Sequence, residues 1–249
     1  MVSNEMGQQM NFLVTGGCSF STVFNHNADI THGGTWPHVL KLLWCNDDWE
    51  HFSTASEGQG NGLISRRLIY TLSQLLFEKK VLPEQILVGV MWSGPSRGEL
   101  YCNYVEDKNL IKFIDESVGA WKRILNPPVN GYDGITTFYF KHVQHRIPSQ
   151  IFTYEHVLRL QWFLKYHNIK YFMTTYTKEV FPDDLKNHSD IKHLHDQVDW
   201  SKFLPIDGAY EWCRDHSNIS FPIPGDMHPG FKQHHAFTER VVIPFVNNL

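Results

Sequence analysis

Short apolar runs with β-strand character alternate along the chain with longer stretches whose apolar residues recur at helical spacing. Residues 11–15 and 49–53 are predicted as short strands, residues 170–176 as a later strand, and residues 219–223 as the last one. Residues 86–92 form an uninterrupted apolar run. Such a run is typical of a central parallel strand that is buried on both faces.

Helical periodicity is clearest in residues 63–79, where apolar side chains recur every three or four positions from Ile64 to Leu76. Asn61 is a suitable N-cap for this helix, since its side chain can accept a hydrogen bond from the first turn. Further helices are predicted at residues 36–44, 153–167, 209–214 and 231–246. The alternation of strands and helices predicts an α/β fold in which helices cover both faces of a parallel sheet.

Two segments fit this alternation poorly. Residues 101–133 and 177–218 are irregular in pattern, and we interpret them as insertions that shape a pocket. No repeat, low-complexity tract or linker divides the chain, and 249 residues suit one large core. We therefore expect a single domain over residues 1–249.

Charge and composition narrow the classes of function. The chain has 22 Lys and Arg against 26 Asp and Glu, and this balance gives no electrostatic reason to bind nucleic acid or an anionic membrane. No apolar run approaches the roughly 20 residues that span a bilayer, and the first residues lack the order of a signal peptide. The four cysteines are widely spaced, which suits reduced thiols. A cytoplasmic protein is the expectation, with the oligomeric state left open.

Two distant segments carry residue types that together could cleave an ester. The first predicted strand runs into Gly17-Cys18-Ser19, a turn that presents a hydroxyl, and Asp226-Met227-His228 lies in a Pro- and Gly-rich stretch near the other end. A serine becomes a good nucleophile when a base takes its proton and a third group orients that base. Ser19, His228 and Asp226 are the candidates for these three roles.

The order of these segments resembles the SGNH (GDSL-type) hydrolase family, which has a serine block after the first strand, a glycine block after the second and an Asp-His block near the C-terminus. The resemblance implies a three-layer, flavodoxin-like αβα fold with the site at the carboxyl edge of the sheet. It also implies that Ser19 is the nucleophile, His228 the general base and Asp226 its orienting acid, with no metal or organic cofactor.

An esterase also needs donors for the developing oxyanion. The N–H groups of Ser19 and Gly58 are the expected backbone donors, with Gly60 as the alternative to Gly58. The chain departs from the family pattern because Cys18 stands where the motif has aspartate, and because the segment from Met91 to Arg97 lacks the family's asparagine. We expect Asn61 to supply the missing side-chain donor, with Ser93 as the alternative.

Several other residues are candidates for substrate binding or metal binding. Trp92 could line the substrate pocket, although a core position is the commoner fate of such a tryptophan, and Arg97 could hold a substrate carboxylate or pair with Glu99. His193 and His195 would share a face if they lay on a strand, but no third ligand stands at a metal-binding spacing. His234 and His235 are expected on the surface of the last helix, and Trp36 and Trp162 in the core.

The sequence therefore favours a serine esterase acting on a small-molecule or glycan ester, most plausibly a small acyl group such as an acetyl group on a sugar. The alternative is a protein that keeps this fold, has lost efficient catalysis and binds a glycan or other ligand. A metal-dependent hydrolase that uses the histidines between residues 188 and 216 is the third hypothesis.

Overall fold

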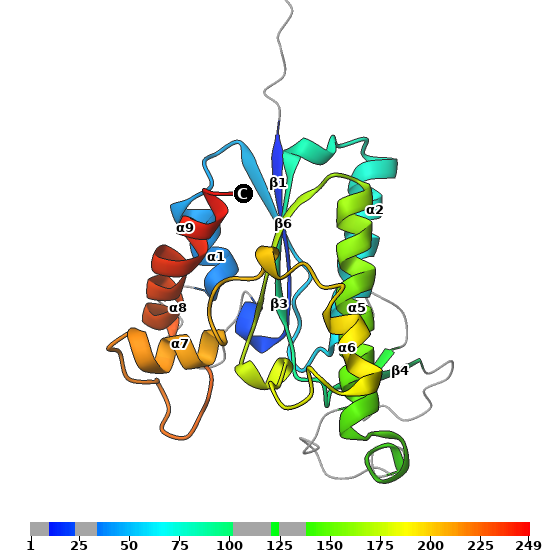
Figure 1. The fold of residues 1–249 in the computed structure, drawn as a ribbon. Helices are drawn as coiled ribbons and strands as arrows, with labels where there is room; N and C mark the ends of the chain where they lie inside the picture. The colour runs from blue at the N-terminus through cyan, green and yellow to red at the C-terminus, as the bar shows by residue number, and fades with distance from the viewer. Residues whose placement is uncertain (1–9, 23–33, 102–120, 125–137) are drawn as a thin grey trace, which may run out of the picture.

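The structure is a computed structural model that describes residues 10–22, 34–101, 121–124 and 138–249. Its centre is a parallel sheet with the strand order β2-β1-β3-β6 (Figure 1). These strands are β1 (Asn11–Gly16), β2 (Trp49–Ser53), β3 (Ile86–Trp92) and β6 (Lys170–Thr175). An order that begins 2-1-3 is that of flavodoxin-like doubly wound sheets, so the expected fold class is confirmed.

Burial along the strands explains which of them lie at the centre. All seven residues of β3 are buried, as the unbroken apolar run predicts for a strand with neighbours on both sides and helices on both faces. β2 is an edge strand and none of its residues is buried. β6, at the other edge, is buried from Tyr171 onwards because a later segment runs beside it, with the Leu204 N–H donating to the Met173 carbonyl at 2.9 Å.

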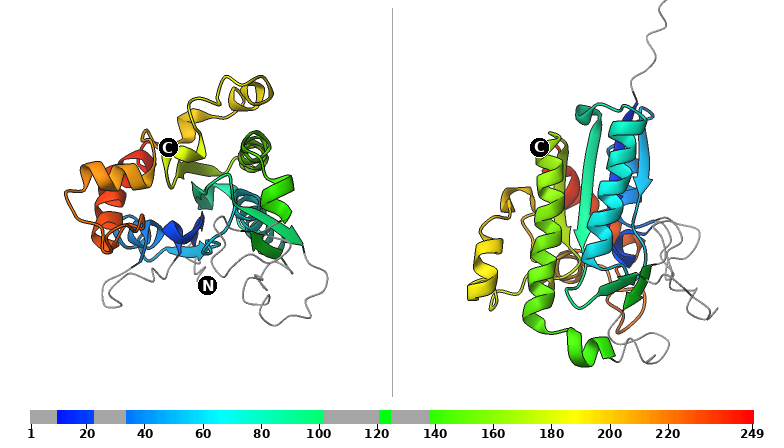
Figure 2. Two further views of the ribbon diagram at one scale, coloured as in Figure 1. Left: turned by 90° about the horizontal axis from the view of Figure 1, so that it is seen from below. Right: turned by 90° about the vertical axis from the view of Figure 1, so that its right-hand side faces the viewer.

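Helices form two layers around this sheet. One face is covered by α2 (Asn61–Ser73), α5 (Arg146–Tyr166) and α6 (Ser189–His195). The other face is covered by α1 (Trp36–Leu43), α7 (Ala209–His216), α8 (Phe231–Phe237) and α9 (Ile243–Val246), as Figures 1 and 2 show. Each layer has its own core, because alternate strand residues point to opposite faces. Val14 thus packs with Leu68 of α2, whereas Leu13 packs with Trp36 of α1.

Several element boundaries differ from the predictions. α2 begins at Asn61 itself, and Gly60 is its N-cap, so the prediction that Asn61 caps this helix is wrong. A π-helical turn (Gln74–Glu78) continues α2, and another (Thr238–Val242) joins α8 to α9. α5 begins at Arg146, earlier than predicted. Residues 219–223 form no strand, since the segment turns sharply instead.

The two segments interpreted as insertions have different outcomes. Most of residues 101–133 lie outside the described part of the chain. Of that region, β4 (Gly98–Tyr101) and β5 (Trp121–Ile124) form a small antiparallel sheet beside the start of α2. Residues 177–218 are ordered by short helices, namely α6, α7 and the 3-10 turns Lys178–Val180 and Trp200–Lys202.

None of the helices in the described residues combines the length and the apolar character that crossing a bilayer requires.

Candidate active site

In the turn that follows β1, Ser19 is flanked by buried residues. Ser19 begins a single 3-10 turn (Ser19–Ser21) and is partly exposed, whereas Cys18, Phe20 and Ser21 are buried. The Trp36 indole N–H donates to Ser21 Oγ at 2.9 Å, and the Ser21 N–H donates to the Cys18 carbonyl at 2.8 Å. This turn, residues 16–22, is called the serine turn below. It presents one hydroxyl at the carboxyl end of a central strand while its neighbours are fixed in the core.

Asp226 and His228 lie in an exposed loop, residues 219–230, called the histidine loop below. The Asp226 carboxylate accepts a hydrogen bond from the His228 backbone N–H at 3.0 Å, and the His228 ring nitrogen Nδ1 lies 2.6 Å from the same oxygen. Because a carboxylate can only accept, Nδ1 carries the proton in this contact. The other nitrogen, Nε2, is then free to act as an acceptor.

The histidine loop meets the serine turn across 209 positions of sequence. Ser19 Oγ lies 2.8 Å from His228 Nε2, within hydrogen-bond reach, and the Phe20 ring packs against the His228 ring with centroids 5.0 Å apart. With Nδ1 protonated, the serine hydroxyl donates to Nε2. The structure therefore brings together Ser19, His228 and Asp226 in the Ser-His-Asp arrangement that activates a serine nucleophile.

A buried glutamine, which the sequence analysis did not single out, ties the two ends of the histidine loop together. Gln233 is fully buried in α8; its side-chain oxygen accepts from the Gly230 N–H at 2.9 Å and its amide donates to the Ile219 carbonyl at 3.1 Å. A glutamine three residues after a helix N-cap is the sequence signature of a capping box, and that signal was available from Gly230-x-x-Gln233.

One turn behind the loop, His234 is buried, so the expectation that it lies on the surface is wrong. Only 2% of the residue is exposed, and its Nδ1 has no hydrogen-bond partner. Burial, with a smaller contribution from the nearby His228, lowers the pKa of His234 to about 3. His234 is therefore a neutral imidazole at any physiological pH. Its neighbour His235 is half-exposed and lies 3.8 Å from Glu239.

The glycine-rich segment after β2 forms a turn beside the serine turn. The Ser56 N–H and the Gln59 side-chain amide both donate to the Gly17 carbonyl, at 3.3 and 3.2 Å. Gly58 has a φ of +66°, a left-handed conformation that favours glycine. Within the described residues, the N–H groups of Ser19 and Gly58 donate to no protein acceptor. Both therefore remain candidate donors for an oxygen bound beside Ser19.

Gly60 has a different role, because a carboxylate occupies its surroundings. A Cβ at Gly60 would lie 2.3 Å from Oε1 of Glu99, which reaches over from β4. Burial raises the pKa of Glu99 to about 6, against the opposing effects of Arg66 and of the Leu63 and Gly60 backbone N–H groups. The Gly60 N–H is therefore directed at Glu99, which favours Gly58 as the backbone donor. Glu99, which the sequence analysis mentioned only as a partner for Arg97, instead faces the start of α2.

The expected side-chain donors are both engaged elsewhere. The Asn61 amide donates to the Ser93 carbonyl at 2.9 Å and to Thr153 Oγ1 at 3.2 Å, while its oxygen accepts from the Ser93 N–H at 2.7 Å. Asn61 has no amide hydrogen left for a substrate, and Ser93 is fully buried with its Oγ bonded to Arg97. The expectation that either residue completes an oxyanion hole is corrected: their contacts join the start of α2 to the end of β3.

The two predicted substrate-binding residues are in different settings. Trp92 is fully buried and its indole N–H contacts the Met173 sulfur at 3.3 Å, so it is a core residue and lines no pocket. The Arg97 guanidinium is partly exposed and lies 5.5 Å from the centre of the Tyr176 ring. Tyr176 in turn packs edge-on against Phe20, 5.3 Å away. Arg97 is thus at the border of the site, whereas the expected core residue Trp162 is 55% exposed.

Among the described residues, no group of three or more His, Cys, Asp or Glu side chains is placed to hold a metal ion. His193 and His195 lie on α6, where residues two apart point in different directions, so the prediction that they share a strand face is wrong.

Comparisons with known proteins add one broad match. The model of a protein family of unknown function (DUF6071) matches residues 31–242, a range that includes the histidine loop but not Ser19. A search of the curated proteins found no match. Among solved structures, the chain is similar to protein YXIM from Bacillus subtilis, with 12% sequence identity and a TM-score of 0.48. That likeness covers 96% of this chain and 57% of the Bacillus protein.

Proposed function

We propose that this chain, which belongs to the family of unknown function DUF6071, is a serine esterase that cleaves a small acyl ester. One observation supports this most strongly: Ser19 Oγ lies 2.8 Å from His228 Nε2, and His228 Nδ1 lies 2.6 Å from Asp226. The two contacts join a nucleophile, a base and an orienting acid from opposite ends of the chain. A serine that only capped a turn would need neither partner.

In the proposed reaction, Ser19 Oγ attacks the ester carbonyl carbon while His228 Nε2 takes the hydroxyl proton. The carbonyl oxygen gains a negative charge, which the N–H groups of Ser19 and Gly58 stabilise. His228 then protonates the leaving alcohol, which departs and leaves an acyl group on Ser19. Water, deprotonated by His228, releases the acid. Asp226 keeps the His228 ring oriented and stabilises its charged form throughout.

The substrate class rests on the family resemblance and on the residues around Ser19. An acyl ester or a carbohydrate O-acetyl ester is proposed, with Arg97 contacting the part of the substrate that extends towards Tyr176. The described cysteines Cys18, Cys45 and Cys213 are free thiols, which supports the proposal of a cytoplasmic setting.

The direct test is hydrolysis of p-nitrophenyl acetate and a panel of acetylated sugars by the full chain and by Ser19→Ala. The variant should lose nearly all turnover, and a fluorophosphonate probe should label Ser19, as mass spectrometry of the labelled peptide would report. Ser220→Ala is the matched control, since Ser220 is exposed in the histidine loop and contacts neither catalytic partner. Equal turnover by Ser19→Ala and the unaltered protein would disprove the proposal.

A second candidate function is a binding protein with weakened catalysis. The engagement of Asn61 favours it, because the hole then has two backbone donors and no side-chain donor from that residue. Loss of one donor typically costs about 10²–10³ in rate. This candidate predicts that fluorophosphonate still labels Ser19 while turnover stays negligible on every ester, and that a glycan binds equally well to Ser19→Ala.

A further inference from the structure

A cavity lies at the carboxyl end of β6, away from Ser19. It has a volume of about 790 Å³, and its wall includes Thr174 and Thr175, the last two residues of that strand. A smaller cavity of about 220 Å³ adjoins it and shares Phe181, Asp183 and Trp200. β3 separates β6 from β1 in the sheet, so two strand spacings, roughly 10 Å, lie between this cavity and the serine turn. The proposed ester cleavage does not use it.

Aromatic rings meet at steep angles on the wall of this cavity. Phe181 stands at 89° to Trp200 and at 80° to Phe203, with centroids 5.3 and 5.7 Å apart, and Trp200 lies 4.9 Å from Phe203. All three rings are partly exposed and line the larger cavity. The negative faces of aromatic rings attract a cation, and rings set at angles to one another form the cages that hold quaternary ammonium groups.

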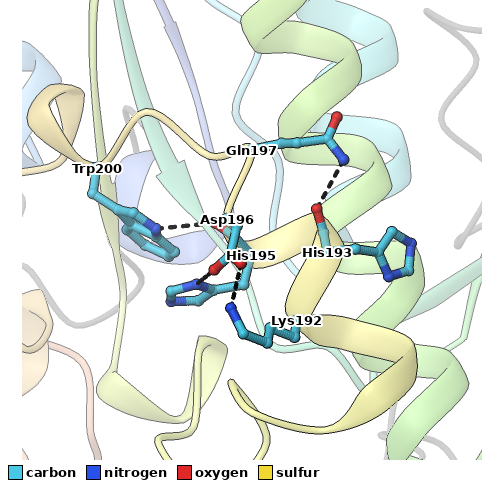
Figure 3. A network of polar contacts seen from close by, with 6 residues as sticks. All are labelled: Lys192, His193, His195, Asp196, Gln197 and Trp200. Carbon is cyan, nitrogen blue, oxygen red and sulfur yellow. Dashed lines mark hydrogen bonds and ion pairs between the residues drawn. The ribbon is translucent and has the colours of Figure 1, made fainter.

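The orientation of the central ring is fixed before any ligand arrives. Figure 3 shows Trp200 beside the end of α6, where its indole N–H donates to the His195 backbone carbonyl at 3.2 Å. The His195 ring packs against Trp200 with centroids 4.9 Å apart, and Asp196 next to it is paired with Lys192. A pre-organised platform lowers the ordering cost of binding.

The charges on the wall are mainly negative. Four carboxylates and one lysine line the cavity: Glu179, Asp183, Asp184, Asp207 and Lys178. Ion pairs with Lys186 and Arg146 lower the pKa of Asp183 and of Asp184, so both stay charged at neutral pH. These pairs are exposed and hence weak. Among the described residues, the exposed carboxylates of Glu179 and Asp207 make no close ion pair or side-chain hydrogen bond, although Arg146 interacts electrostatically with Glu179. Both carboxylates can attract a cation.

We propose that this cavity is a binding site for a small organic cation with a methylated ammonium head. The ammonium group lies against Trp200, Phe181 and Phe203, and the carboxylates of Glu179 and Asp207 balance its charge. A divalent metal would gain nothing from the rings, and a neutral sugar would lack the attraction between opposite charges. The site is independent of Ser19.

The first experiment is calorimetric titration of the full chain with choline and with its uncharged carbon isostere, 3,3-dimethylbutan-1-ol. Choline should bind at least about tenfold more tightly, since only it gains the cation–π and charge interactions. Its affinity should fall with added salt. Ser19→Ala should bind choline as the unaltered protein does. Equal binding of the isostere, displacement of choline by Ca²⁺, equal binding of glucose, or no saturable binding at millimolar choline would each overturn the proposal.

Variants of residues that line the cavity test whether choline binds there. Trp200→Leu should weaken choline binding about tenfold, whereas Trp162→Leu, at an exposed tryptophan of α5, should leave it unchanged. The exposed double variant Glu179→Gln/Asp207→Asn should weaken binding and flatten its salt dependence, and Glu84→Gln is its control. Unchanged choline affinity in the double variant, which removes no buried group, would contradict the assignment.

Discussion

The serine turn and the histidine loop meet at one hydrogen bond, but they are held in opposite ways. The serine turn is part of the core: Cys18, Phe20 and Ser21 are at most 2% exposed. The histidine loop lies mostly at the surface, with Ile223 and Met227 more than 40% exposed and Gly225 at a φ of +83°. Its position depends on local polar contacts, chiefly those of Asp226 and Gln233.

Because of this difference, we expect changes in the two segments to affect the protein in different ways. A change beneath the serine turn disturbs packing shared with the whole α1 layer, so it should appear as lost stability. A change in the polar contacts of the histidine loop disturbs less apolar packing, so it should appear mainly as lost activity in a protein that remains folded. The predictions below test this division, and all activity readouts assume the proposed ester cleavage.

The largest expected effect is that of Asp226→Asn. Asparagine can turn an amide N–H towards Nδ1 and carries no negative charge, so the His228 ring loses its fixed tautomer, and kcat/KM for an acetyl ester should fall about 10³–10⁴-fold. The melting temperature should change little, because Asp226 is in an exposed loop. Asp47→Asn, at an exposed carboxylate before β2, is the control. A loss of activity under tenfold would mean that Asp226 serves only the loop turn.

Gln233→Met should have the next largest effect on activity. It removes both bonds that join Gly230 to Ile219, so the loop can drift from Ser19 and kcat should fall about 10–100-fold, since misplacement of about 1 Å can cost that much. KM should change less than kcat. Gln197→Met is the control, because the exposed Gln197 also donates to a backbone carbonyl, that of His193 (Figure 3). It follows α6, on the other face of the sheet from α8 (Figure 1). Equal activity of the two variants would remove Gln233 from the positioning role.

His234 makes the histidine side of the molecule sensitive to acid. Its pKa is about 3 in the fold and near 6.5 when unfolded, so the unfolded chain binds the proton first as the pH falls. The contribution of neutral His234 to the free energy of unfolding is therefore fully present above pH 6.5. It decreases as the pH falls below this value, by about 2 kcal/mol at pH 5.

Urea unfolding at pH 7.5 and pH 5 measures that loss. His234→Leu, which also removes the unpaired Nδ1, should lose about 2 kcal/mol less stability than the unaltered protein over this interval. His235→Leu, at the neighbouring half-exposed histidine, is the control for the loss of an imidazole. If His234→Leu and the unaltered protein lose the same stability, His234 is not the group that titrates.

The sequence predicted the fold well because strands and helices leave a local periodic signal. The unbroken apolar run of β3 reflects burial of the strand on both faces. The apolar stripe of α2 reflects burial of the helix on one face. The wrong prediction of a strand at residues 219–223 shows the limit of this signal. The segment begins the histidine loop, where the Ile219 carbonyl accepts from Gln233 and the Phe221 ring packs against Tyr210. These contacts with other segments cannot be read from the apolar pattern.

The three residues of the candidate triad could be predicted, but the partners of the residues around them could not. Ser19, His228 and Asp226 were found because the chemistry needs those types at a strand end and in a late loop. Asn61 was misread because its partners, Ser93 and Thr153, lie 32 and 92 positions away. The glycine at position 60 suggested room for a substrate, but the room is taken by Glu99. Such contacts between distant segments leave no local pattern.

The smallest effect on activity is expected from Trp36→Phe, which tests the serine side. The change removes the indole hydrogen bond to Ser21 Oγ and leaves a small void in a fully buried site, so stability should fall by about 1–2 kcal/mol. Activity per folded molecule should change less than about threefold, because Cys18 and Phe20 still hold the turn. Trp162→Phe, at an exposed site, should alter neither quantity. A large loss of kcat at full stability would instead place the serine turn under the same local control as the histidine loop.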